Sequence, residues 1–174
     1  GKGIGAGTEP LSVRLCVKAP DLARLVASRR ELNPARLSLS GKVTFDGLHT
    51  FRVDTENSFL QIFVHSDSPK DLRRFFRYHI QYGDEEYVLD GVKVLADAPG
   101  FDAWHDTATL YVQLTGPRGQ ERGILRLSIE TFVREQMPSM RITGTSDPAR
   151  QSWALLAFYK YFAGELADIY MQRA

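Results

Sequence analysis

The sequence predicts a mainly β protein: an antiparallel β-barrel or a two-sheet sandwich, with a short helix near 20–31 and a long C-terminal helix near 147–172. Three observations predict this fold class. Apolar and polar residues alternate with period two over many short segments, and turn residues separate neighbouring segments at hairpin spacing. Only the last segment repeats its apolar residues at helical spacing. Strands do not alternate with crossover helices, which disfavours an α/β plan.

The first predicted strand covers residues 11–18 and is followed by the short helix. Its apolar side chains share one face: Leu11, Val13, Leu15 and Val17. Pro20 suits the start of a helix, and Asn33-Pro34 is typical of its end. The alternation resumes over 36–45, and Asp46-Gly47 indicates a turn after it.

The next predicted strands are 58–66, 73–82, 86–97, 107–114, 123–129 and 140–145. Gly83-Asp84 and the "GPRG" at 116–119 would join two pairs of them as hairpins. A closed barrel would remove the sheet edges and enclose a cavity, so that it would be lipocalin-like in outline. The sequence does not choose between barrel and sandwich.

The C-terminal segment changes to a helical period. Ser146 or Asp147 can cap a helix that has Pro148 at its first position. Its apolar side chains recur every three or four residues: Leu155, Tyr159, Phe162, Leu166 and Ile169. Trp153 and other residues widen the stripe, which favours packing on the sheet as core. Docking on a partner and lying at a membrane surface are the alternatives.

Composition bounds the class of protein. The 174 residues fit a single domain over 11–174, preceded by a glycine-rich stretch, 1–10, that we expect to be a flexible linker or a remnant of an expression tag. A net charge of +1 gives no general field for nucleic acid or an anionic membrane. The single cysteine, Cys16, excludes an internal disulfide and suits the cytoplasm. No apolar run reaches the ~20 residues of a transmembrane helix.

Acidic residues and a histidine crowd together in the stretch 97–106. His105 or Asp102 could act as a base in an isomerase-type enzyme. The spacing of the aspartates matches no EF-hand, and no nucleophile motif occurs anywhere in the chain. We therefore favour a Pro99-Gly100 turn plugged by aromatic side chains, with no metal and no cofactor. "RRFFR" at 73–77 interleaves arginine with phenylalanine as RNA-binding segments do, but strand alternation explains this order, and we expect no nucleic-acid partner.

Residues 90–114 and several later segments resemble a known family. The matching residues are Gly91, Lys93, Asp97, Pro99, Gly100, Phe101, Asp102, Trp104, Asp106, Thr107, Thr109, Leu110, Tyr111, Gly123, Ile124, Leu125, Arg126, Thr131, Phe132, Arg134, Gln136, Phe162, Ala163, Gly164, Leu166, Asp168 and Tyr170. The pattern resembles an accessory domain, without FAD, that occurs in bacteria beside cholesterol-oxidase-like glucose–methanol–choline flavoenzymes and α/β-hydrolase units. The resemblance implies a lipid-related context, and the family's catalytic residues lie in other domains.

The expected function is that of a non-catalytic accessory module. It would bind a hydrophobic, lipid- or sterol-like ligand, or dock on an enzyme that metabolises one. The side chains expected to line the ligand site are Phe63, Tyr78, His79 and Tyr111. The alternative is a purely structural interaction module that uses the C-terminal helix, and an enzyme using His105 or Asp102 ranks third. In this interpretation the domain alone has no activity and belongs to a larger oxidoreductase or hydrolase.

Overall fold

The computed structural model describes residues 11–45, 47–66, 74–83, 87–95, 109–117, 119–126, 134–135 and 137–171. The strands are β1 (Leu11–Lys18), β2 (Leu37–Phe45), β3 (His49–Arg52), β4 (Phe59–His65), β5 (Arg74–Tyr82), β6 (Tyr87–Leu95), β7 (Thr109–Gly116) and β8 (Gly119–Arg126). The helices are α1 (Leu22–Ala27), the short 3-10 helix η1 (Ser28–Arg30), α4 (Met137–Ser139) and α5 (Pro148–Met171).

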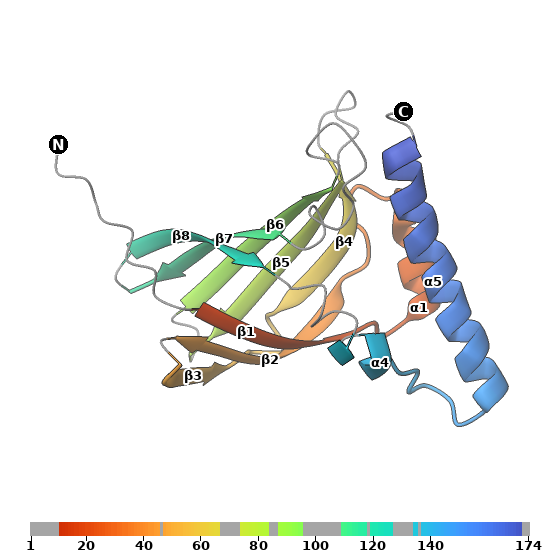
Figure 1. The fold of residues 1–174 in the computed structure, drawn as a ribbon, viewed down its shortest axis with the longest axis horizontal. Helices are drawn as coiled ribbons and strands as arrows, with labels where there is room; N and C mark the ends of the chain where they lie inside the picture. Colours follow the sequence, from red (N-terminus) through yellow and green to blue (C-terminus); the bar gives the residue numbers. More distant parts are fainter. Residues whose placement is uncertain are drawn as a thin grey trace.

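The strands form one antiparallel sheet in the order β1-β2-β4-β5-β6-β7-β8, and β3 pairs with β2 beside this path. The sheet curls into a half-barrel, with β1 and β2 on one side of the trough and β7 and β8 on the other (Figure 1). The predicted mainly β, antiparallel fold with an N-terminal and a C-terminal helix is confirmed. Of the two alternatives, the described strands match a curled single sheet rather than a two-sheet sandwich.

Period-two alternation gives the half-barrel two distinct faces. On β5, Phe76, Ile80 and Tyr82 are buried on the concave side, which we call the inner face. His79 lies between them in sequence and therefore on the convex side, which we call the outer face. Leu39 and Val43 of β2 and Leu89 and Leu95 of β6 complete the inner core.

Helix α5 packs against the inner face at the β4–β5 end of the trough, with α1 beside it (Figure 1). The contact is aromatic. The ring of Phe63 meets Tyr161 edge-on at a centroid distance of 5.7 Å and lies 5.1 Å from Phe76. Phe63 sits at an irregularity in the β4–β5 register and has a φ of 55°. The bulge turns this ring toward α5, at the cost of a conformation that bulky residues rarely adopt.

Several features differ from the prediction. Strand β8 begins at Gly119, whereas the predicted strand begins at 123, because 119–122 contain no apolar residue that marks a period. Strand β3 was not predicted, because its four residues are too few to establish a period. The predicted strand at 140–145 is wrong: this segment has no strand pairing, and its Thr145 carbonyl accepts a hydrogen bond from the side chain of Gln151 on α5 instead. The residue before a proline is disfavoured in a helix, so the sequence predicts that any helical turn over 130–137 ends before Pro138. Pro138 instead lies within α4, because a proline in a first turn removes no helical hydrogen bond.

Candidate functional site

Phe63 and Tyr78, two of the four residues expected to line a ligand site, lie on the inner face. Phe63 is fully buried between β5 and α5, where its surroundings are the rings of Phe76 and Phe162. Tyr78 lies opposite Gly91 of β6 and is only partly buried. The space beside Gly91 is filled by Leu110, whose side chain would lie 2.9 Å from a Cβ at this position.

His79, the third expected residue, lies on the outer face. Its Nδ1 is 2.6 Å from Asp90 Oδ1, and its ring stacks on Phe59 at a centroid distance of 5.2 Å. The guanidinium of Arg36 lies 4.0 Å from the centroid of the same Phe59 ring. Arg36, Phe59, His79 and Asp90 therefore form one polar–aromatic row across the outer side of the sheet.

Tyr111, the fourth, also lies on the outer face, where 46% of its surface is exposed. Its neighbours across β6 and β8 are Val92 and Ile124. The half-barrel thus brings Phe63 and Tyr78 to the same side of the sheet and separates them from His79 and Tyr111. His105 and Asp102, the candidates for a catalytic base, lie outside the described residues.

Lys93 is the polar residue of the inner face that the site prediction did not include. It lies on β6 opposite Phe76, is only 9% exposed, and its Nζ is 5.8 Å from the centroid of the Tyr78 ring. Burial lowers the pKa of its ammonium group to about 8. The sequence pattern of β6 could have identified Lys93, because period-two alternation places it on the same face as the core residues Leu89 and Leu95.

A second polar group lies where α5 meets the half-barrel. Burial raises the pKa of Glu165, while the charges of Arg29, Arg74 and His65 act against this rise. His65 Nε2 lies 3.3 Å from the carbonyl oxygen of Arg29, and His65 is the cross-strand neighbour of Arg74. We call these four residues the Glu165 cluster. It joins η1, β4, β5 and α5 through ionisable side chains.

Among the described residues, two buried tyrosine hydroxyls have no hydrogen-bond partner. Tyr161 is 6% exposed and lies beside the Glu165 cluster, and Tyr82 is 1% exposed at the other end of β5. Burial raises the pKa of both hydroxyls. The Tyr82 ring stacks on Tyr87 at a centroid distance of 5.3 Å. Burial without a partner is unfavourable for a hydroxyl, so both positions are polar sites within an apolar interior.

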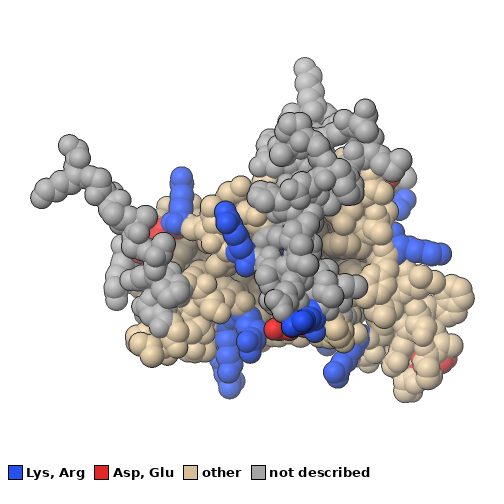
Figure 2. All heavy atoms as spheres, viewed as in Figure 1, with Lys and Arg blue, Asp and Glu red and all other residues tan. Residues whose placement is uncertain are grey.

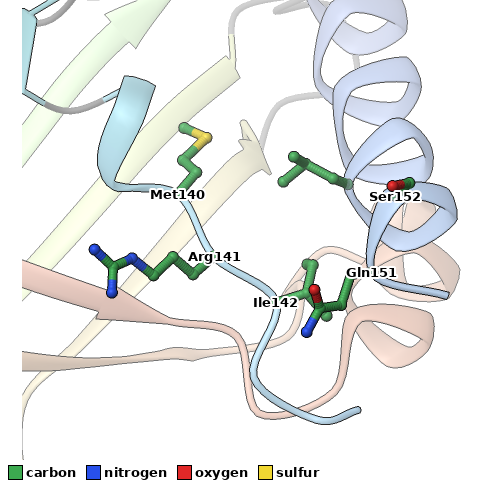
Figure 3. A pocket seen from close by; sticks show the side chains of 6 residues that line it. Met140, Arg141, Ile142, Gln151 and Ser152 are labelled. Atoms are coloured by element: carbon green, nitrogen blue, oxygen red, sulfur yellow. The ribbon is translucent and has the colours of Figure 1, made fainter. Parts of the chain in front are cut away.

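A shallow groove of about 350 Å³ lies between the segment after α4 and the start of α5 (Figure 3). Its lining comprises Met140, Arg141, Ile142, Gln151, Ser152 and Leu155. Arg141 points away from α5 in this view, so the wall facing the helix is formed by Met140 and Ile142. Beyond the groove, α5 exposes Trp153 to 69% and Leu156 to 43%. These two side chains depart from the expectation that the wide apolar stripe of α5 is core.

Among the described residues, no three His, Cys, Asp or Glu side chains are placed to hold a metal ion. None of the described helices combines the length and the apolar character that crossing a membrane requires. No protein-family model, no curated protein and no solved structure matches this chain.

Proposed function

We propose that the protein binds a hydrophobic ligand on the inner face of the half-barrel, beside Tyr78 and Lys93. The observation that carries this proposal is the position of Tyr78. Its side chain keeps accessible surface although it lies on the face that forms the core. At the same time, burial raises the pKa of its hydroxyl to about 12. A ring that faces a sheltered part of the trough, rather than open water, would both keep accessible surface and have a raised pKa.

Lys93 supports a ligand that is apolar over most of its length and has one polar end. Lys93 lies opposite Phe76, and its ammonium nitrogen is 5.8 Å from the centroid of the Tyr78 ring. Ligand sites in proteins are mostly apolar with a few polar groups that fix orientation. A lipid-like or sterol-like molecule with one hydroxyl or acidic group has this chemistry.

Native mass spectrometry of the purified protein tests the proposal. We expect a co-purified small molecule that is released on denaturation and is extracted into organic solvent. Oleyl alcohol added to stripped protein should restore a one-to-one complex. A protein that carries no such molecule and does not bind oleyl alcohol contradicts the proposal.

A second candidate function is docking through α5, and the exposure of Trp153 favours it. Exposed large apolar side chains that adjoin one another are typical of interaction sites. The lower right of Figure 2, where α5 begins, is mostly uncharged with a few acidic atoms, and Asp147 and Arg150 form an ion pair at this end of the helix. In this role the domain would sit beside a flavoenzyme or hydrolase domain, or beside a second copy of itself. The exposed thiol of Cys16 favours a reducing, cytoplasmic setting for either role.

Sedimentation equilibrium tests the docking of a second copy. We expect concentration-dependent association that is lost in Trp153→Ser and kept in Leu32→Ser, because Leu32 is similarly exposed but lies in the loop after η1 and not on α5. Equal association of both variants would show that α5 is not the contact.

A further inference from the structure

The outer face of β1, β2 and β3 carries a row of three cations. Arg14 lies opposite Lys42, and Lys42 lies opposite Arg52. All three are exposed, as is Lys18 at the end of β1. We call Arg14, Lys42 and Arg52 the basic row. Lys and Arg side chains project along the lower edge of the molecule in Figure 2, where β1 and β2 lie in Figure 1.

The remaining outward positions of these strands carry hydroxyl or thiol groups. They are Ser12, Cys16, Ser38, Ser40, Thr44 and Thr50. No acidic side chain alternates with the cations on this face of the three strands, and within the described part of the chain the basic row forms no ion pair. The single hydrogen bond between side chains here joins the hydroxyls of Thr44 and Thr50 at 3.0 Å.

This arrangement is unfavourable for the folded protein alone. Like charges directly opposite each other on neighbouring strands destabilise a sheet, because their side chains lie about 5 Å apart. Surfaces that only need to stay soluble mix charges of both signs. A row of one sign, with no acidic residue at the outward positions of the same three strands, therefore fits an anionic partner that neutralises it.

The residue types on this face favour a lipid surface over a single-stranded nucleic acid as the anionic partner. The face has no exposed aromatic ring on which a nucleic-acid base could stack, and single-stranded nucleic acids are bound through such rings. It does have an exposed apolar residue beside the cations: Leu48, at the turn between β2 and β3, is 81% exposed. Residues of the basic row lie about three strand positions from this turn, or about 10 Å.

We propose that the outer face of β1, β2 and β3 docks on the surface of a bilayer that contains anionic phospholipid. The basic row and Lys18 contact the phosphate and carboxylate groups of the lipid heads. Leu48 enters the interface between head groups and acyl chains, as apolar side chains of peripheral proteins do. The hydroxyls of the same strands donate to phosphate oxygens.

Vesicle co-sedimentation tests this proposal. The probes are phosphatidylcholine vesicles with and without phosphatidylserine. We expect the wild-type protein to bind only the vesicles with phosphatidylserine, and to be released as salt screens the charges. The triple variant Arg14→Gln, Lys42→Gln, Arg52→Gln should bind on the order of a hundredfold more weakly, at about fivefold for each cation. Its folding is not at risk, because the substitutions remove repulsion between exposed side chains.

A second triple variant, which removes the same number of cations elsewhere, tests whether the effect is specific to the basic row. The triple variant Arg122→Gln, Arg126→Gln, Arg150→Gln removes three exposed cations from β8 and α5 and should bind as the wild type does. Leu48→Ser should weaken binding a few-fold without changing its dependence on salt. Equal losses in the two triple variants, or equal binding to neutral vesicles, overturn the proposal. Binding of duplex DNA through the basic row, without binding to anionic vesicles, overturns it in favour of a nucleic-acid partner.

Discussion

Lys93 Nζ lies 5.8 Å from the centroid of the Tyr78 ring on the inner face of the half-barrel. This distance is within the range of a cation–π interaction, which favours the charged amine. Burial acts in the opposite direction and lowers the pKa of Lys93 to about 8. The pair therefore holds an amine whose charge changes within the range of pH at which the protein can be studied.

The stability of the protein should rise with pH because of Lys93. Its pKa is about 8 in the folded state and near the ordinary 10.5 when unfolded, so between these values the unfolded chain binds more protons. The free energy of unfolding should then increase by about 2 kcal/mol from about pH 7.5 to about pH 9.5. Urea denaturation should show this rise in the wild type and in Lys160→Met, and should not show it in Lys93→Met. A rise of the same size in Lys93→Met would contradict the assignment.

Tyr161→Phe should stabilise the ligand-free protein. The substitution removes a hydroxyl that is buried without a hydrogen-bond partner and keeps the ring against Phe63. We expect a gain of about 1 kcal/mol, seen as a higher melting temperature. Tyr159→Phe is the matched control on the same helix: its exposed hydroxyl contacts the sulfur of Met140, and its loss should change stability by less than about 0.5 kcal/mol. A lower melting temperature of Tyr161→Phe would show that this hydroxyl has a partner.

Gly41→Ala should severely destabilise the half-barrel where β1 pairs with β2. Gly41 has a φ of 142°, and a Cβ at this position would lie 2.1 Å from the carbonyl oxygen of Arg14. We expect a loss of about 3 kcal/mol or more in the free energy of unfolding, because backbone rather than a flexible side chain must move. Gly47 has a φ of 68°, but a Cβ added there would meet open space. Gly47→Ala should therefore lower the free energy of unfolding by only about 1 kcal/mol. Similar denaturation midpoints for the two variants would argue against the close approach at Gly41.

The sequence predicted the strands well where their period was long enough to recognise. Segments such as 11–18 and 73–82 alternate over eight or more residues, and the structure has strands there with bounds that differ by at most one residue. Alternation predicts which residues share a face of the sheet, but it does not predict which face turns inward. The contact of Phe63 and Phe76 with α5 decides this for β4 and β5, and it depends on residues about 90 positions apart in the chain.

The candidate site was harder to predict for the same reason. Tyr78 and His79 are neighbours in sequence, and only the position of α5 separates them into inner and outer residues. Lys93 could have been found from its own strand. The basic row could not, because Arg14, Lys42 and Arg52 belong to three strands that the register brings together, and β3 was not predicted.

Equilibrium binding of oleyl alcohol to Tyr78→Ala and Tyr111→Ala tests whether the ligand lies on the inner face. Both variants lose the same side chain, one from the inner face and one from the outer face. If the ligand lies beside Tyr78, Tyr78→Ala should raise the dissociation constant at least about tenfold, equivalent to about 1.4 kcal/mol, and Tyr111→Ala should leave it unchanged. Tyr78→Trp, whose larger ring would occupy space that the ligand uses beside Tyr78, should also weaken binding. Wild-type affinity in both Tyr78 variants, or equal losses in Tyr78→Ala and Tyr111→Ala, would contradict a ligand site on the inner face.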